Sequence, residues 1–596
     1  MKNEWAAERK QLIDIAMGRK KADLVIKNGQ WVNVQSGEIL PGMDIAIGGE
    51  RIAYVGEDAS HTIGKNTTVI EANGKFLVPG LLDAHMHVES GMITVTEFVR
   101  AVLPRGTTGM FIDPHEIANV FGLKGVRLMA DEAAEQPIHV WVQMPSCVPS
   151  APGLETPGSS IGPEEVAEAM EWDGIIGLGE MMNFPGVFNS DAKMLAEMAA
   201  TADAGHVIGG HYASLDLGLP FHGYAAGGPA DDHEGTRVED AIARVRQGMK
   251  VMMRLGSAWH DVATQVRAVL DHGLDSRHFI LCTDDSHSET LVNDGHMDRV
   301  VRHAIEQGLA PIKAIQMATL NTAEHFGVSA DMGMIAPGRY GDINLVSDLA
   351  AFEIESVIAK GKLAAEKGQL MIDLPEYSYP DWATESVKLG HQLTPEDFLL
   401  SAPIENGTVT ANVIGVIENQ APTKHLHKKV DVDSGQVRVD VKNDLAKIAL
   451  VERHQGTGGV QMGLVSGFGF SEPCGIATTV AHDSHHMIVV GTNEEDMAQA
   501  ANLLAEKGGG QVVVCAGEVI GMVELPIAGL MSNQKAEIVA EKAATVLQGF
   551  IECGCTINNP NMQLSLLALV VIPELRISDL GLVDVTKFDF VPVLES

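Results

Sequence analysis

The chain has 596 residues, too many for one hydrophobic core, so two to four domains are expected. Its formal net charge of −37 repels nucleic-acid phosphates, which argues against a role in binding DNA or RNA. The six cysteines are scattered without a Cys-x-x-Cys pair, which favours a reduced, cytoplasmic protein. No segment has the pattern of a signal peptide or a membrane helix.

The chain begins with a charged segment, residues 1–21, whose pattern predicts a helix. Residues 22–79 then carry short apolar runs bounded by Gly, Asn or Pro, which predict short strands. A similar pattern returns over residues 335–376. We therefore expect one small β-sandwich domain that is built from two separated segments, with a large domain inserted between them.

The inserted region, residues 80–334, alternates strand and helix patterns. Helical patterns include residues 192–204, 238–247 and 298–307. The eight predicted strands are residues 81–85, 109–113, 138–142, 175–180, 206–211, 224–228, 250–254 and 279–284. Eight βα units over about 250 residues predict a (β/α)8 TIM barrel of the α/β class, whose active sites lie at the carboxyl ends of the strands.

The last part of the chain predicts a further domain. Residues 377–384 contain Pro, Tyr and Trp and are interpreted as a linker. Residues 390–596 mix strand patterns with helical patterns at 494–507 and 536–549. This length is sufficient for an additional C-terminal α+β domain that folds on its own.

The first predicted barrel strand ends in His85-Met86-His87. Alternate side chains of a strand point to the same side, so both imidazoles can reach one metal ion. Neutral imidazoles are suitable ligands for divalent transition metals. The tripeptide alone is weak evidence for a metal site. Its interpretation depends on further ligand-type residues at the ends of later strands.

Such residues follow at the ends of strands four, five, six and eight. They are Glu180, His211, His233 and Asp284. Singly, each has an ordinary structural interpretation, such as a core histidine, a buried carboxylate or a helix cap. Their shared location favours a site for two metal ions, with Glu180 as the bridge and Asp284, rather than Asp285, as a ligand and proton acceptor.

Residues 79–87, Pro-Gly-Leu-Leu-Asp-Ala-His-Met-His, are similar to the opening motif of the amidohydrolase superfamily of metal-dependent hydrolases. The small β domain assembled from both flanks is also typical of that superfamily. Many members bridge two metals with a carbamylated lysine on strand four. This chain has Glu180 there, which disfavours a dihydroorotase- or urease-like site.

The chain resembles one family of this superfamily more closely, the bacterial adenine deaminases that act on the free base. The resemblance extends over nearly the whole chain. The matching segments are residues 111–119, 177–187, 231–234 and 283–287 of the barrel, and residues 480–486 and 490–493 of the C-terminal region.

This resemblance implies a binuclear centre that holds two divalent ions, manganese or iron, with zinc as an alternative. The implied metal ligands are His85, His87, Glu180, His211, His233 and Asp284. The implied reaction is attack of metal-activated hydroxide on C6 of adenine, which gives hypoxanthine and ammonia in purine salvage. The expected partner is this small-molecule substrate, and a homodimer or higher homo-oligomer is expected because large barrels of this superfamily commonly associate.

Further candidates concern the substrate. Glu116 is the candidate acid that protonates a ring nitrogen, with a salt-bridged loop residue as the alternative. Ser146 and Arg254 are candidate substrate contacts, and Arg254 is equally interpreted as half of a structural ion pair. Residues 482–486, which include the candidate substrate contact His485, are expected to cover the barrel mouth. A separate metal site and an exposed polar loop are the alternatives.

Two other functions remain open: a binuclear amidohydrolase acting on a cyclic amide or another aminated heterocycle, and a non-catalytic metal-binding barrel. A cytidine-type deaminase is excluded. Its His-x-Glu and Pro-Cys-x-x-Cys motifs are matched only by residues 87–89 and by Pro473-Cys474, and position 477 is Ala477. These two fragments also lie in different predicted domains.

Overall fold

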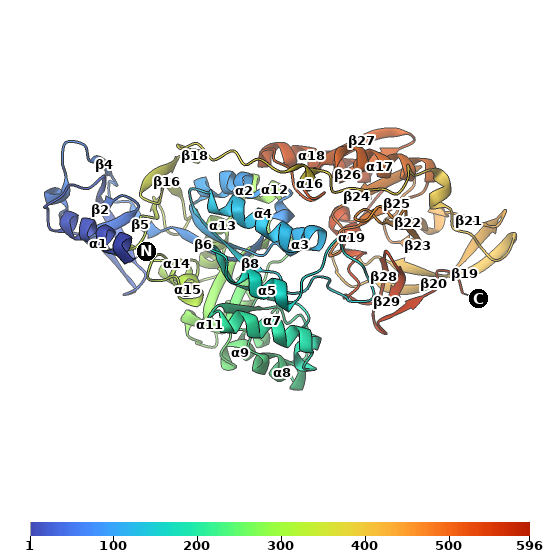
Figure 1. The fold of residues 1–596 in the computed structure, drawn as a ribbon, viewed down its shortest axis with the longest axis horizontal. Helices are drawn as coiled ribbons and strands as arrows, with labels where there is room; N and C mark the ends of the chain where they lie inside the picture. The colour runs from blue at the N-terminus through green and yellow to red at the C-terminus, as the bar shows by residue number, and fades with distance from the viewer. Residues whose placement is uncertain (1, 596) are drawn as a thin grey trace.

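The computed structural model describes residues 2–595. A small β region with helix α1 lies at one end of the elongated molecule, the barrel is in the middle, and the C-terminal region is at the other end (Figure 1). Among the described residues, no helix combines the length and the apolar character that crossing a membrane requires.

The small β region is a nine-stranded sheet that joins two separated parts of the chain. Its order is β18-β17-β16-β15-β5-β1-β2-β3, with β4 paired to β1, and β15 runs antiparallel to β5. The side chains of Leu24, Ile45 and Ile343 pack together in its core. The elements are α1 (Lys2–Ala16), β1 (Leu24–Asn33), β2 (Glu38–Gly48), β3 (Arg51–Gly56), β4 (Thr68–Glu71), β5 (Phe76–Pro79), β15 (Ile343–Val346), β16 (Ile354–Ala359), β17 (Lys362–Glu366) and β18 (Gln369–Leu370).

The inserted region is a (β/α)8 barrel. Strands β6 to β10 are parallel neighbours, β11 to β13 form a second parallel group, and β14 pairs with β6 to close the ring. The two groups meet where Ala230 N–H donates to the carbonyl of Ile208 at 2.9 Å. The strands are β6 (Leu81–His87), β7 (Thr107–Ile112), β8 (His139–Met144), β9 (Ile175–Met181), β10 (Val207–Gly210), β11 (Asp231–Asp232), β12 (Lys250–Arg254), β13 (Phe279–Cys282) and β14 (Asp284–Asp285).

Helices surround the barrel, and three of them, α7, α9 and α13, lie within one or two residues of the predicted helical segments. The barrel helices are α2 (Val95–Val102), α3 (His115–Phe121), α4 (Leu123–Ala134), α5 (Pro163–Ala169), α6 (Phe184–Phe188), α7 (Ala192–Asp203), α8 (Leu219–Gly227), α9 (Val238–Arg246), α10 (Val262–Gln265), α11 (Arg267–Leu270), α12 (Ser288–Asn293), α13 (Met297–Glu306), α14 (Pro311–Met317) and α15 (Leu320–His325).

The prediction of strand six at residues 224–228 is wrong. Those residues belong to helix α8 and its end, and the sixth strand is β11, only two residues long. Periodicity cannot separate a short apolar run of a helix from a buried strand. Proline at the start of α8 and Gly228 at φ 115° after it bound this helix. The Tyr224 hydroxyl donates to the Met181 carbonyl at 3.1 Å, so the helix supports the neighbouring strand ends.

The C-terminal region is built on a second nine-stranded sheet, in the order β21-β20-β19-β23-β22-β25-β24-β26-β27. Helices α17 and α18 cover opposite faces, because α17 packs with Val512 and α18 packs with Val513. The predicted linker contains the one-turn helix α16 (Asp381–Thr384).

The elements of this region follow one another from residue 406 to residue 591. They are β19 (Asn406–Gly415), β20 (Lys424–Asp433), β21 (Gln436–Val437), β22 (Ala446–Val451), β23 (Val460–Ser466), β24 (Cys474–Thr478), β25 (Met487–Gly491), α17 (Glu494–Lys507), β26 (Gly510–Cys515), β27 (Glu518–Glu524), α18 (Ala536–Glu552), α19 (Pro560–Leu566), β28 (Leu575–Ser578), β29 (Gly581–Asp584) and β30 (Asp589–Val591).

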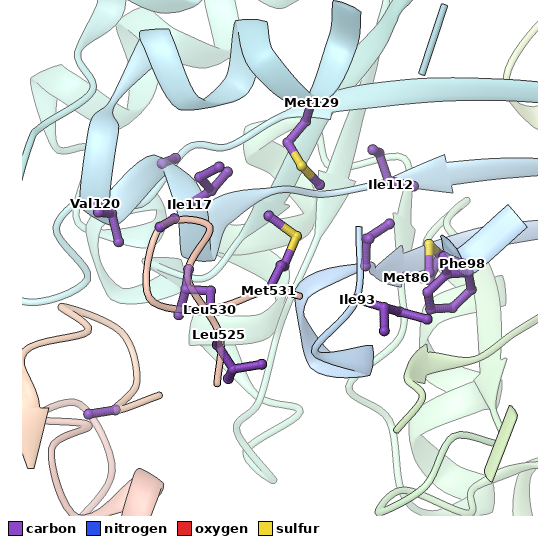
Figure 2. Packing of buried hydrophobic residues seen from close by; sticks show 14 of the residues in the cluster. Met86, Ile93, Phe98, Ile112, Ile117, Val120, Met129, Leu525, Leu530 and Met531 are labelled. Carbon is purple, nitrogen blue, oxygen red and sulfur yellow. The ribbon is translucent and has the colours of Figure 1, made fainter. Parts of the chain in front are cut away.

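The barrel and the C-terminal region share one continuous apolar core. Figure 2 shows Leu530 and Met531 of the C-terminal region beside Ile117 of the barrel. Backbone hydrogen bonds reinforce this contact, since Ser532 N–H donates to the carbonyl of Met92 at 2.9 Å. The two regions are therefore held in a defined relative position, which allows both to contribute to one site.

Candidate metal centre

The residues predicted from the strand ends lie together at the carboxyl end of the barrel. His87 Nε2 is 3.2 Å from Asp284 Oδ1 and 3.7 Å from Glu180 Oε1, and His85 Nε2 is 3.9 Å from Asp284 Oδ1. The rings of His85 and His233 are stacked with centroids 4.1 Å apart. Strand alternation places both histidines of β6 on the inner face, as the sequence predicts.

Glu180 lies between two groups of ligand atoms. His233 Nε2 is 3.0 Å from its Oε2, and His211 Nδ1 contacts the same oxygen. Burial raises the pKa of Glu180, but the neighbouring histidines, His211 first, hold it well below its ordinary value. The carboxylate therefore stays ionised although it is enclosed, and its two oxygens face different histidine pairs.

The donor set fits divalent cations. The ligand atoms of three overlapping groups each lie within 4.8 Å of one another, and the groups are His85/His87/Glu180, His85/His233/Asp284 and Glu180/His211/His233. His85 Nε2 is buried and has no hydrogen-bond partner in the structure. Imidazole nitrogens and carboxylate oxygens together suit Mn²⁺, Fe²⁺ or Zn²⁺.

Backbone geometry separates Asp284 from its neighbour Asp285. Asp284 has φ 62°, an uncommon conformation for a residue other than glycine, and it pairs with Met86 across β14 and β6. Its carboxylate faces the histidines. Asp285 instead accepts hydrogen bonds from Ser90 Oγ at 2.5 Å and Trp259 Nε1 at 3.3 Å. Asp284 is thus the carboxylate that points into the centre.

Arg254 contacts Asp284 and not open space. Its Nη1 donates to Asp284 Oδ2 at 3.0 Å, its Nε donates to Asp261 at 2.8 Å, and it also contacts Glu234. Burial raises the pKa of Asp284, yet the hydrogen bond from His87 and the charge of Arg254 depress it strongly. This geometry corresponds to the structural ion pair, the alternative interpretation of Arg254.

A second layer orients the ligands. His87 Nδ1 donates to the carbonyl of Asp113 at 2.8 Å, which leaves Nε2 free to face the centre. The carboxylate of Asp113 accepts from Glu180 N–H at 2.8 Å, and a Cβ at Gly179 would collide with it. Ser146 Oγ donates to the Glu180 carbonyl at 2.8 Å, so Ser146 supports the backbone of this strand.

His115, for which the sequence predicts no role, lies at the end of strand two between Pro114 and Glu116. Its Nδ1 is 3.4 Å from Glu180 Oε1, is buried, and has no hydrogen-bond partner in the structure. His115 also forms a group of closely spaced ligand atoms with His482 and Asp483 of the C-terminal region. Its position at a strand end was the available signal.

Residues 482–486 lie against the barrel and are largely enclosed. His482 Nδ1 is 3.9 Å from Glu116 Oε1, and the rings of His482 and His485 are 5.2 Å apart. His485 is fully buried, its Nδ1 accepts from Ala481 N–H at 3.2 Å, and its Nε2 has no partner in the structure. The exposed-loop interpretation of this segment is therefore wrong.

Glu116 is a buried carboxyl at the edge of the centre. Burial raises its pKa well above the ordinary value, and the nearby Glu89 raises it further. Ser90 Oγ is 3.5 Å from Glu116 Oε1. Within residues 2–595, no Lys or Arg side chain forms a salt bridge with Glu116. A neutral carboxylic acid of this kind can donate a proton.

A cavity of about 130 Å³ opens beside Glu116 and His482. Ser90 and His287 line it from the barrel, while Leu547 and Asn559 line it from the C-terminal region. Both parts of the chain therefore form the cavity beside Glu116.

Comparison with known proteins agrees with this architecture. The amidohydrolase family model matches residues 76–364, and the model of the adenine deaminase C-terminal domain matches residues 420–589. The first of these matches, together with the barrel and its histidine and carboxylate cluster, defines an amidohydrolase domain. Members of that family use divalent metal ions.

Full-length relatives narrow the class. Adenine deaminase 3 of Rhizobium meliloti is 63% identical over 100% of both chains. Adenine deaminase of Mesorhizobium japonicum is 63% identical over 98% of this chain and 96% of its own. The chain belongs to the adenine deaminase family.

A solved β-aspartyl dipeptidase from Fervidobacterium islandicum AW-1 matches 59% of this chain and 100% of its own, with 18% identity and a TM-score of 0.46.

Proposed function

We propose that the chain is an adenine aminohydrolase that converts adenine and water to hypoxanthine and ammonia. The observation that carries this proposal is the cluster of four histidines with the two carboxylates Glu180 and Asp284. It is supported by the full-length similarity to relatives that are named adenine deaminase. Purine salvage is the corresponding physiological role.

The proposed metal ligands are the six strand-end residues, with Glu180 as the bridge. They are His85, His87, Glu180, His211, His233 and Asp284. We propose manganese or iron as the native ions, with zinc as an alternative, because imidazole and carboxylate donors suit all three. When bound, such ions polarise water and lower its pKa, which supplies a nucleophile at neutral pH.

The protein side chains would move the protons. Asp284 is ionised and faces the centre, so it can accept a proton from the attacking water and pass it to the departing amino group. Glu116 is neutral, so it can donate a proton to a ring nitrogen and make C6 more electrophilic. His115, His482 and His485 enclose this space, and we propose that they contact the heterocycle and exclude bulk water.

We propose that Arg254 and Ser146 act as positioning residues for this reaction. Each contacts a proposed ligand residue, Arg254 through the carboxylate of Asp284 and Ser146 through the backbone of Glu180. We also propose a division into residues 22–79 with 335–376, residues 80–334 and residues 390–596. We propose a cytoplasmic location, which the free cysteines support. We also propose that the protein forms a homodimer.

The deciding experiment is an assay of ammonia and hypoxanthine release from adenine by chelator-treated protein. Activity should return when about two equivalents of Mn²⁺ or Fe²⁺ are added per chain. Cyclic amides and other aminated heterocycles are tested in parallel. Protein that binds two ions but leaves adenine unchanged would refute adenine as the substrate, and turnover of another compound would identify the alternative amidohydrolase.

A further inference from the structure

Three cysteines of the C-terminal region converge although they come from three different elements. Cys474 begins β24, Cys515 ends β26, and Cys553 directly follows α18. The side chains of Cys474 and Cys553 lie in one buried cluster, and Cys515 packs against it. All six cysteines of the chain are free, so none of these sulfurs is used in a disulfide.

The sheet register brings the first two thiols together. Cys474 and Cys515 are direct partners in the antiparallel pair of β24 and β26. The adjacent pair is hydrogen-bonded, because Ala516 N–H donates to the Pro473 carbonyl at 3.0 Å. The two cysteines therefore occupy a non-hydrogen-bonded position, where side chains of opposite residues lie closest and on the same face.

Helix α18 brings the third thiol to that face. Its side chains Val546 and Phe550 belong to the same apolar cluster as Cys474 and Cys553. Gly549 permits this close approach, because a Cβ there would press on Val513 of β26. The carbonyl of Cys553 then accepts from Ser471 N–H at 3.0 Å, which fixes the end of the helix beside the start of β24.

The environment of the cluster favours a cation. Cys474 and Cys553 are fully buried and Cys515 is partly exposed, which leaves one side through which an ion can enter. Three thiols that converge in one buried cluster supply the ligand type that zinc prefers, at metal–sulfur distances of about 2.3 Å.

We propose that Cys474, Cys515 and Cys553 form a second metal site, independent of the barrel centre, for one thiophilic divalent cation of the Zn²⁺ type. Binding replaces three S–H bonds by three metal–sulfur bonds and releases three protons, with no change in oxidation state. The ion would join β24, β26 and the end of α18. Because β24 leads directly into residues 479–486, the site would also anchor the segment that carries His482.

The test uses Cd²⁺ as the probe on full-length protein whose barrel centre has first been loaded with Mn²⁺. Wild-type protein should bind one further equivalent of Cd²⁺ and show an ultraviolet thiolate-to-cadmium charge-transfer band, which histidine and carboxylate ligands do not produce. Cys553→Ser should lose the band. Cys147→Ser, which removes a buried barrel thiol, is the matched control and should keep it.

A second variant keeps the test decisive if Cys553→Ser does not fold. Cys515→Ser changes the partly exposed thiol and should weaken Cd²⁺ binding at least 10-fold, while circular dichroism remains that of the wild type. Absence of the band in wild-type protein with titratable free thiols would overturn the proposal. A Cys474–Cys515 disulfide found by mass spectrometry in protein isolated without reductant would also overturn it.

Discussion

At the scale of single residues, the centre depends on where each carboxylate points. Glu180 and Asp284 both lie among the histidines, whereas Asp285, the next residue along the chain, turns to Ser90 and Trp259. The sequence placed both aspartates at the same strand end and favoured Asp284 from the register. The left-handed backbone at Asp284 and its hydrogen bond from Arg254 are the physical reasons for this orientation.

Replacing the proposed bridge tests its role directly. Glu180→Gln removes the charge between the two histidine pairs, so metal content and turnover of adenine should fall together, turnover by more than about 100-fold. Metal analysis of the purified variant and a steady-state assay give the two quantities. Glu171→Gln, at an exposed position, is the control. Full metal occupancy in Glu180→Gln would rule out the bridging assignment.

The proposed proton acceptor predicts a different kinetic effect. Asp284→Asn keeps the size of the side chain but removes its basicity, so kcat should fall by about 10³-fold while KM changes only a few-fold. Asp285→Asn is the comparison, since that carboxylate faces Ser90, and it should lose far less activity. Equal losses in the two variants would remove Asp284 from proton transfer.

At the scale of elements, the helices around the barrel contain buried charge that the sequence pattern does not reveal. Helix α7 was predicted almost to its observed ends, yet Glu197 on it is completely buried with both carboxylate oxygens lacking a hydrogen-bond partner in the structure. Burial raises the pKa of Glu197 to about 8. The charge of Lys193, whose Nζ is 3.6 Å from Glu197 Oε1, offsets only part of this rise. The folded state thus holds this proton more tightly than the unfolded state does.

This shift predicts a pH-dependent stability. Because the pKa of Glu197 is raised on folding, its contribution to stability is fully present at pH values below the unfolded-state pKa of about 4.5. That contribution is lost as the pH rises through about 8, the pKa in the folded state. Between pH 5 and pH 9, the free energy of unfolding of Glu197→Gln should therefore rise by about 2 kcal/mol or more relative to that of wild type. Thermal unfolding at several pH values measures this difference. The exposed Glu168→Gln is the control, and parallel curves for Glu197→Gln and wild type would contradict the prediction.

At the scale of the whole molecule, the barrel and the C-terminal region form one packed unit. Leu530 and Met531 lie in the same buried cluster as Ile117 of the barrel (Figure 2). This packing holds residues 482–486 against Glu116 and His115. Residues of both regions line the cavity beside Glu116, so neither region alone encloses it.

A truncation in this shared core should lower the stability of the whole protein. Met531→Ala removes a fully buried side chain and leaves a cavity, so it should cost about 2–4 kcal/mol. Chemical denaturation monitored by fluorescence provides the measurement. Met371→Ala, at a residue that is 55% exposed, should stay within about 0.5 kcal/mol of wild type. Similar denaturation midpoints for the two variants would show that Met531 does not stabilise the contact between the barrel and the C-terminal region.

The sequence by itself determined the barrel and the neighbourhood of its centre, because strand alternation and the carboxyl-end rule place His85, His87, Glu180 and His211 without any long-range information. It failed at strand six, where two residues are too few to show a period. Only the tertiary structure decided that His115 meets His482 and Asp483, and that three distant cysteines lie in one buried cluster. These contacts join loops and elements far apart along the chain, and local periodicity carries no record of such pairings.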